Sequence, residues 1–287
     1  MSEWTGLPES VRTWTGPLPE GTVELRLRAG QRPEIRTANE SRFAPPVLSA
    51  RQVRAAVDEM ARHSLYAWEE ELKEGFFTME NGSRVGLGGR FVVREGQISG
   101  ISHISSAAVR VARAIPGCAQ ALRPHLCAGA EAVSALILSA PGLGKTTLLR
   151  DLARSLSRGE EGWPACRVGL ADERCELAAC RDGVPTLDVG PRTDVYEACP
   201  KRLAIPRMVR ALSCDVIVTD ELGQASDAEC VLDALRCGVR VIASAHARCL
   251  EEALSRPALR ELLAARAFDA VIELGGRIGQ IRRVIRP

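Results

Sequence analysis

Lysine is scarce in this chain of 287 residues. Of its 38 basic residues only Lys73, Lys145 and Lys201 are lysines, so arginine carries nearly all of the positive charge. An ammonium group is a compact point charge, whereas a guanidinium group is planar, bulkier and built for paired hydrogen bonds. Lys145 lies in a loop motif that needs the compact charge. A lysine at this position in so arginine-rich a chain therefore favours a functional role for the motif.

Aromatic residues make up only 4% of the chain, and its 38 basic residues are almost balanced by 36 acidic ones. A groove for single-stranded nucleic acid needs stacking aromatic rings and a track of positive charge. We therefore expect no nucleic-acid partner. No stretch reaches the ~18 uncharged apolar residues of a membrane span, and the N-terminus lacks the charged-then-apolar order of a signal peptide. The sequence predicts a globular, cytoplasmic protein.

Cys-x-x-Cys pairs are missing, although the chain has 10 cysteines. A zinc site or a redox motif would bring pairs of cysteines close together in the sequence. Here the cysteines are scattered and most have apolar neighbours, at positions 118, 127, 166, 175, 180, 199, 214, 230, 237 and 249. We expect reduced thiols packed in the interior.

A glycine-rich segment follows an apolar run at residues 132–138 and precedes a helical pattern. In such a strand–loop–helix, backbone N–H groups and the positive end of the helix dipole surround a polyphosphate, while a lysine reaches the outer phosphates and a hydroxyl coordinates Mg²⁺. The alternative is a glycine-rich turn with a chance Lys-Thr pair. The first position departs from the usual glycine. The predicted nucleotide-binding residues are Ser139, Ala140, Pro141, Gly142, Leu143, Gly144, Lys145, Thr146 and Thr147, with Thr146 also a metal ligand.

A second motif supplies the carboxylates that a nucleotide hydrolase needs. Asp220 and Glu221 follow an apolar run at residues 216–219. Hydrolysis needs one carboxylate to hold Mg²⁺ and another group to orient the attacking water, so we assign Asp220 to the metal and Glu221 to the water. The ends of parallel strands open on the crevice where α/β folds bind ligands. Alone, this motif also fits a buried strand that ends in a solvated acidic turn.

Two further strand ends carry polar side chains. Residues 171–176 form an acidic cluster that includes Asp172 and Glu176, and His246 follows another apolar run. A polar residue in the position of His246 can sense the terminal phosphate, or it can belong to a surface turn.

The apolar runs divide the chain into two parts. Residues 1–115 contain alternating segments and a helical pattern at 49–64 with Ser49 as N-cap, which predicts a smaller α+β domain. Apolar runs at 132–138, 166–171, 216–219, 239–243 and 270–274 alternate with helical stretches. This alternation predicts an α/β domain at 131–287 with a parallel sheet covered on both faces, and Pro and Gly residues place a linker at 116–130.

The chain resembles a known family in blocks spread over nearly its whole length. They are residues 24–28, 64–67, 75–78, 84–87, 109–113, the segment Asp172-Glu173-Arg174-Cys175-Glu176, and the segment Asp188-Val189-Gly190-Pro191-Arg192-Thr193-Asp194-Val195 followed by Cys199-Pro200-Lys201. These blocks are similar to the stage III sporulation protein AA family, whose C-terminal half resembles the hexameric ATPases of type II and type IV secretion. The chain departs from the family pattern at Asn81-Gly82-Ser83, Ser139 and Cys214.

The resemblance implies a RecA-like or AAA+ P-loop ATPase that binds ATP and Mg²⁺. It implies a hexameric ring in the mother-cell cytoplasm, peripheral to the membrane and acting with membrane proteins of the channel to the forespore. Arg110, or as second candidates Arg113 or Arg84, would stabilise charge on the phosphates. Asp172 and Glu176 would position water or Mg²⁺. The family's most distinctive block holds Arg192 and Asp194, to which spacing alone gives no role.

Three functions remain open on the sequence. We favour an oligomeric ATPase motor or assembly factor. A nucleotide-gated scaffold with negligible turnover fits the departure at Ser139, and a nucleic-acid-dependent ATPase fits the P-loop core but not the composition.

Overall fold

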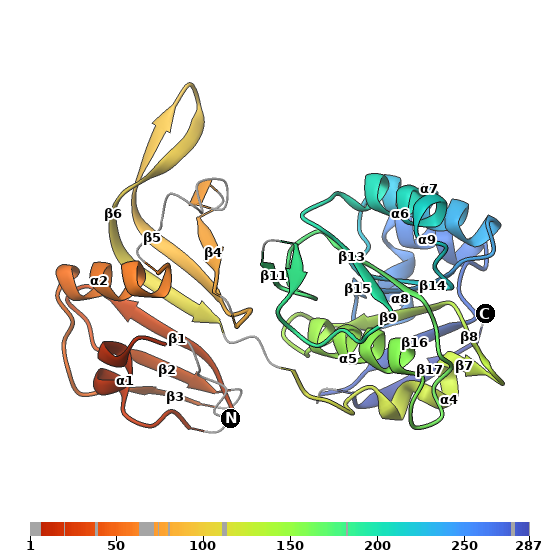
Figure 1. Ribbon diagram of the computed structural model, residues 1–287, viewed down its shortest axis with the longest axis horizontal. Helices are drawn as coiled ribbons and strands as arrows, with labels where there is room; N and C mark the ends of the chain where they lie inside the picture. The colour runs from red at the N-terminus through yellow and green to blue at the C-terminus, as the bar shows by residue number, and fades with distance from the viewer. Residues whose placement is uncertain are drawn as a thin grey trace. The chain divides into compact units, whose positions relative to one another are not determined.

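The computed structural model describes residues 7–19, 21–37, 40–62, 72–73, 75–79, 81–110, 114–181, 183–276 and 279–286. It divides into two compact units, Met1–Arg113 and Ala114–Pro287 (Figure 1). The segment 116–130 is not the predicted linker, because it is packed into the second unit. Leu122 and Leu126 are fully buried in the core of that unit, and the Asp151 carboxylate accepts the N–H groups of Gly117 and Ala119. The apolar residues of the segment anchor it there.

Unit 1 is an α+β domain with a six-stranded antiparallel sheet in the order β3-β2-β1-β6-β5-β4. The described helices Glu9–Thr15 and Ala50–Met60 contribute to its core, among others with Val11 and Val53. The elements are α1 (Glu9–Thr15), β1 (Thr22–Arg28), β2 (Glu34–Thr37), β3 (Ser41–Phe43), α2 (Ala50–Met60), β4 (Phe76–Thr78), β5 (Arg84–Arg94) and β6 (Gln97–Arg110).

The predicted helix at residues 49–64 is α2. Ser49 and Gln52 form a reciprocal capping box at its start, and the buried Val53, Val57 and Met60 follow the predicted spacing. The helix ends at Met60, earlier than predicted, and residues 63–64 lie outside the described part of the chain.

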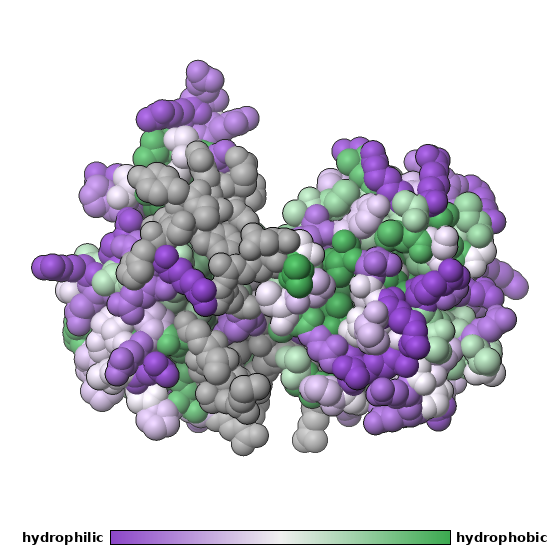
Figure 2. Space-filling model, in the orientation of Figure 1, coloured by the Kyte–Doolittle hydropathy of each residue, from purple (hydrophilic) through white to green (hydrophobic). Residues whose placement is uncertain are grey.

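Strands β5 and β6 form a hairpin longer than the rest of the sheet. β1 pairs with β6 only at residues 106–110, and β4 pairs with β5 only at residues 84–86, so the outer part of the hairpin is a two-stranded ribbon. Figure 2 shows mostly hydrophilic side chains around its end. Polar side chains suit a ribbon whose edges have no sheet neighbour among the described residues.

Unit 2 is an α/β domain with a seven-stranded sheet in the order β13-β10-β14-β15-β9-β16-β17. All neighbouring strands are parallel except β17, which runs antiparallel to β16. The predicted apolar runs form β9, β10, β14, β15 and β16. The elements are η2 (Gln120–Leu122), α4 (Arg123–Leu126), β7 (Cys127–Ala128), β8 (Glu131–Ala132), β9 (Ala135–Ser139), α5 (Lys145–Arg158), β10 (Val168–Asp172), β11 (Cys180–Arg181), β12 (Val184–Pro185), β13 (Thr193–Glu197), α6 (Lys201–Ala211), β14 (Val216–Glu221), α7 (Ala225–Arg236), β15 (Arg240–His246), α8 (Leu250–Leu254), α9 (Pro257–Ala264), β16 (Ala270–Leu274) and β17 (Ile281–Ile285).

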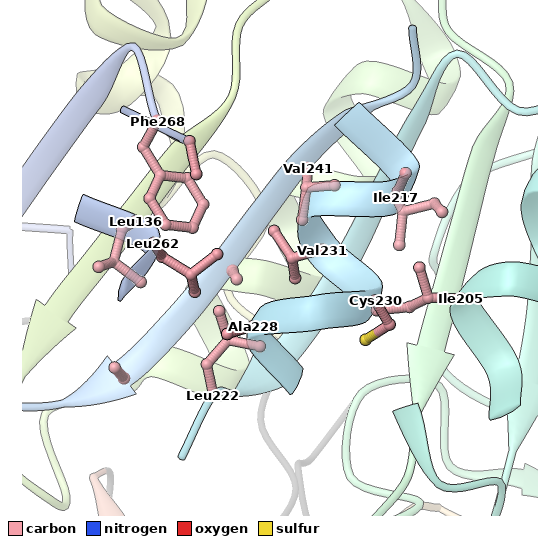
Figure 3. Close-up of a cluster of buried hydrophobic side chains, with 14 of the residues drawn as sticks. Leu136, Ile205, Ile217, Leu222, Ala228, Cys230, Val231, Val241, Leu262 and Phe268 are labelled. Atoms are coloured by element: carbon pink, nitrogen blue, oxygen red, sulfur yellow. The ribbon is translucent and has the colours of Figure 1, made fainter. Parts of the chain in front are cut away.

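Helices cover both faces of this sheet, which explains why its central strands are apolar throughout rather than alternating. On one face, α5 packs over strand residues such as Ile137. On the other face, α6, α7 and α9 form a second core with the strands. In Figure 3, Val231 of α7 and Leu262 of α9 lie among Leu136 and Val241 of the strands. No helix in the described part of the chain is long and apolar enough to cross a membrane.

Residues 188–195, one of the blocks that carry the resemblance, pack against the end of α5. Arg192 donates its backbone N–H to Ser157 Oγ at 2.6 Å and its guanidinium to the carbonyl oxygens of Ser157 and Arg158 at 2.7 and 3.3 Å. A cation on the last carbonyls of a helix satisfies groups that the helix leaves unpaired. Gly190 has φ of 93°, and a Cβ there would lie 2.5 Å from Ser157 Cβ. The block therefore has a structural task.

Gly190→Ala tests this close approach. We expect it to destabilise the fold more than Gly238→Ala, a control at φ of 83° with no neighbour within 4 Å of the added Cβ. The left-handed backbone costs about 1–2 kcal/mol at either position, and the collision with Ser157 adds about 1–3 kcal/mol at Gly190 only. Chemical denaturation of both variants measures the difference. Equal loss of stability would show that the approach to α5 is not tight.

Candidate nucleotide-binding site

Apart from the predicted arginine fingers, the predicted site residues lie along one edge of the sheet in unit 2. Strands β10, β14, β15 and β9 are neighbours and run parallel, so their carboxyl ends lie side by side. These ends carry, in order, the acidic cluster after β10, Asp220 and Glu221 on β14, His246 on β15, and the glycine-rich loop after β9. The fold thus collects four separate sequence motifs at one crevice edge, as expected of a parallel α/β sheet.

The glycine-rich loop turns sharply between β9 and α5. Gly142 has φ of 80°, and Gly144, the N-cap of α5, has φ of 77°. Residues with a Cβ rarely adopt this left-handed backbone, so glycine is needed at both positions. The helix begins at Lys145, and the N–H groups of its first turn are not used inside the helix. These N–H groups and the positive end of the helix dipole attract an anion.

Lys145 is buried against its own loop. Its Nζ donates to the Ser139 carbonyl and Oγ, both at 3.1 Å, to the Ala140 carbonyl at 3.2 Å, and to His246 Nδ1 at 2.8 Å. The residue is 8% exposed, and in the ranges that the structure describes no carboxylate forms an ion pair with it. Ser139, which replaces the usual glycine, gives the ammonium group one more acceptor.

The buried charge of Lys145 is electrostatically unfavourable. Burial lowers the pKa of its ammonium group to about 8, although the charge of Glu221 partly opposes this and Arg256 adds to it. A buried charge is costly unless an opposite charge accompanies it. A polyphosphate at the N-terminus of α5 would supply that charge.

His246 joins Lys145 to Glu221. Its Nδ1 accepts from Lys145, and its Nε2 lies 3.3 Å from Glu221 Oε2. Burial, followed by the charge of Lys145, lowers the pKa of the imidazole below its ordinary value. The ring is therefore neutral at pH 7, with its proton on Nε2 directed to the carboxylate. Arg174 Nη1 forms an ion pair with the same Glu221 oxygen, Oε2, at 2.9 Å.

Asp220 is paired with Lys201, which sequence reasoning did not place at the site. Lys201 Nζ lies 2.6 Å from Asp220 Oδ1 and 2.7 Å from Glu173 Oε2. Burial raises the pKa of Asp220 to about 6, although Lys201 acts in the opposite direction. Burial also opposes the charge of Lys201, but the two carboxylates outweigh it and raise the pKa of Lys201 above its ordinary value.

The acidic cluster differs from its predicted role at Asp172. This residue is fully buried, and its carboxylate accepts the backbone N–H groups of Glu176, Leu177 and Ala178 at 2.8–3.0 Å. Its oxygens shape the turn after β10 rather than face a metal or water. The backbone carbonyl of Glu176 accepts from Arg150 at 2.6 Å, and the half-buried residue belongs to the same turn, so its role with water or Mg²⁺ stays a prediction.

The predicted arginine fingers belong to unit 1. Arg110 ends β6, and its Nε lies 3.6 Å from Glu24 Oε2 while most of its side chain is exposed. Arg84 lies over the ring of Phe76, 3.6 Å from its centroid. Arg113 lies outside the described residues.

Three contact residues escaped prediction, namely Glu173, Arg174 and Lys201. Glu173 and Arg174 stand beside Asp172 in a block that was recognised, but the sequence does not tell which side chain of a turn points inward. The scarcity of lysine could have indicated that Lys201 belongs to the site. It is one of three lysines in an arginine-rich chain, like Lys145 in the phosphate loop.

The donor set at this edge fits a hard divalent cation. Thr146, half-buried in the first turn of α5, carries a hydroxyl, and Asp220 carries a carboxylate that already accompanies a cation. Oxygen ligands of this kind are the ones that Mg²⁺ prefers, with nucleotide phosphates completing its coordination. Thr146 and Asp220 are the residues that would hold it.

The fold and this edge define a class, the RecA-like P-loop proteins. Two solved structures share the fold, the ATPase DotB of Legionella pneumophila (15% identity, TM-score 0.58, 88% of this chain and 72% of that chain) and the pilus retraction motor PilT with bound ADP (16% identity, TM-score 0.55, 93% and 80%).

Within that class, the chain belongs to the family described as sporulation stage III, protein AA, whose model matches residues 12–285. Stage III sporulation protein AA of Bacillus subtilis (strain 168) is 36% identical over 284 residues, which cover 96% of this chain and 92% of the relative.

The lowered pKa of Lys145 predicts a pH-dependent affinity for ATP. Lys145 is charged below about pH 8 and neutral above it, so affinity should fall by up to about tenfold per pH unit above that value. Titration with ATP between pH 7 and 9.5 measures this, and calorimetry in two buffers detects the proton taken up on binding. Lys145→Arg stays charged over this range, so the affinity that its bulkier guanidinium group leaves should depend little on pH. A wild-type affinity that is constant to pH 9.5 would contradict the prediction.

Proposed function

We propose that this chain is a magnesium-dependent ATPase that works as an oligomeric motor in sporulation. The observation that carries the proposal is Lys145, a buried lysine at the N-terminus of α5, on the same sheet edge as Asp220 and Glu221. A compact buried cation beside the unpaired N–H groups of a helix suits a polyphosphate. The family and the ATPase structures that share the fold support it.

Each side chain has a distinct task in this account. Lys145 leaves the carbonyl oxygens of its loop and binds the outer phosphates, and Thr146 and Asp220 hold Mg²⁺. The metal, when bound, neutralises charge on the phosphates. Glu221 orients the attacking water. Positioning and electrostatic stabilisation supply most of the rate in phosphoryl transfer, so the placement of these groups matters more than any covalent step.

His246 links phosphate binding to the water-orienting carboxylate. It touches both Lys145 and Glu221, so movement of the Lys145 ammonium toward a phosphate removes one partner of the ring. The ring is then free to follow the phosphate or to keep Glu221 in place. His246 therefore fits the sensor role that the sequence left open.

Glu221→Gln tests the hydrolytic role. The variant keeps the size of the side chain but loses the charge that orients water, so phosphate release should fall at least about 100-fold while ATP affinity stays within a few-fold of wild type. Glu229→Gln on the exposed face of α7 is the matched control and should turn over normally.

Two results would contradict this role. Equal rates for Glu221→Gln and wild type, both above background, would show that Glu221 does not orient the water. A wild-type protein that binds ATP but shows no turnover even with its membrane partner would instead favour the nucleotide-gated scaffold.

The finer proposal places the protein in a hexameric ring in the mother-cell cytoplasm, under the membrane channel to the forespore. The family, the solved ATPases that share the fold and Arg110 at the end of β6 support it. In a ring, Arg110 would leave Glu24 for the phosphates, as arginine fingers do in related chemistry.

Sedimentation velocity tests the ring. With a slowly hydrolysed ATP analogue and Mg²⁺, we expect assembly to about six copies, because nucleotide phosphates neutralise the arginines that would otherwise repel across the interface. Lys145→Ala, which loses the phosphate contact, should stay at the mass seen without nucleotide. A monomer under every condition would refute the oligomeric motor.

A further inference from the structure

Lys201 occupies an unusual position for a buried cation. It is the first residue of α6 and is 4% exposed. The N-terminal turn of a helix carries partial positive charge, which repels a cation, and burial removes the water that would screen it. A lysine in this place is stable only if nearby carboxylates compensate for both effects.

Three neighbouring strands supply that compensation. Strands β13, β10 and β14 lie side by side, and Lys201 follows the first, Glu173 follows the second and Asp220 lies near the end of the third. The ammonium group bridges the two carboxylates at 2.6 and 2.7 Å. Because Asp172 is used by backbone N–H groups and Glu221 by Arg174 and His246, Lys201 has Asp220 and Glu173 as its own partners.

The two partners differ in their surroundings. The Asp220 side chain is 11% exposed, whereas that of Glu173 is 34% exposed and faces more solvent. The lysine side chain is long and flexible, so its ammonium group can leave the ion pair with Asp220 and keep its hydrogen bond to Glu173 without leaving its charge unpaired. Glu173 can therefore bind the ammonium group when Asp220 does not.

We propose that Lys201 is a tethered cation that competes with Mg²⁺ for Asp220 and withdraws to Glu173 when the metal binds. This inference rests on the proposed function, since it takes Asp220 as a metal ligand. The cluster of Lys201, Asp220 and Glu173 has two negative charges and one positive charge. A divalent cation added to it meets the repulsion of Lys201, which lowers the affinity for free metal and makes metal binding depend on the charge that nucleotide phosphates bring.

Direct binding of Mn²⁺, followed by the paramagnetic resonance of the free ion with the full chain and no nucleotide, tests the competition. Lys201→Met keeps the length of the side chain and removes its charge. We expect its dissociation constant for Mn²⁺ to fall about tenfold or more, because the repulsion between a single and a double charge a few ångströms apart exceeds that factor even when well screened. Lys201→Arg should bind Mn²⁺ like wild type.

Arg202→Met is the matched control, because it removes one positive charge from the next, exposed residue of α6. It should leave Mn²⁺ affinity unchanged. An Mn²⁺ affinity of Lys201→Met that equals or is weaker than that of wild type would overturn the proposal, provided circular dichroism shows the variant folded.

Glu173→Gln decides the question if Lys201→Met does not fold. It leaves Lys201 held by Asp220 alone, so Mn²⁺ should bind more weakly than to wild type, and unchanged binding would overturn the proposal. Where both variants fold, the double variant measures the coupling between Glu173 and Lys201. Under competition the effect of Glu173→Gln on Mn²⁺ affinity becomes clearly smaller once Lys201 is methionine, because only the direct attraction of the Glu173 charge then remains. An effect of equal size in both backgrounds would show that Glu173 does not act through Lys201 and would overturn the proposal.

Asp220→Asn separates failure of this inference from failure of the proposed function. If Asp220→Asn abolishes Mn²⁺ binding while Lys201→Met leaves it unchanged, the metal site stands and only the competition is refuted. If Asp220→Asn has no effect on Mn²⁺ binding, Asp220 is not a metal ligand and both accounts fail.

Discussion

The arrangement of this site depends on a buried positive charge that has no carboxylate of its own within the described chain. Lys145 is held by the carbonyl oxygens of its loop and by a neutral histidine, and its lowered pKa shows that these partners do not fully replace water. Neighbouring groups of the crevice lie in ion pairs: Lys201 contacts both Asp220 and Glu173, which leaves one negative charge in excess, and Arg174 contacts Glu221. An added anion is therefore stabilised most by electrostatic attraction at the phosphate loop.

The topology of the sheet makes this arrangement possible. Parallel strands bring the ends of β10, β14, β15 and β9 to one edge, although the motifs they carry are separated by up to about a hundred residues along the chain. Arg150 then ties α5 to the turn after β10, through hydrogen bonds of 2.6 Å to the carbonyl oxygens of Glu176 and Leu177. The helix that begins at the phosphate loop is thus fixed to the turn that carries Glu173.

The sequence predicted the features that depend on local pattern. Apolar runs located the central strands, Ser49 located the start of α2, and the glycine-rich motif located the loop that precedes α5. It could not predict which side chain of a turn points inward, so Asp172 was assigned a role at the metal although its carboxylate accepts backbone N–H groups. The pairing of Lys201 with Asp220 arises from the adjacency of three strands, which periodicity does not reveal. The proline and glycine residues near residue 117 are typical of a linker, and the sequence was therefore interpreted as one. The leucines that follow them are in fact buried in the core of unit 2.

The central claim is that Lys145, Thr146 and Asp220 meet at one magnesium–nucleotide complex. A crystal structure of the protein with a slowly hydrolysed ATP analogue and Mn²⁺, in which the metal is located by its anomalous scattering, tests it most directly. The account predicts one Mn²⁺ peak with both the Thr146 hydroxyl and the Asp220 carboxylate around it, directly or through water, and Lys145 Nζ on the outer phosphates instead of the Ser139 and Ala140 carbonyl oxygens. A nucleotide bound elsewhere, or a metal peak remote from Asp220, would contradict it.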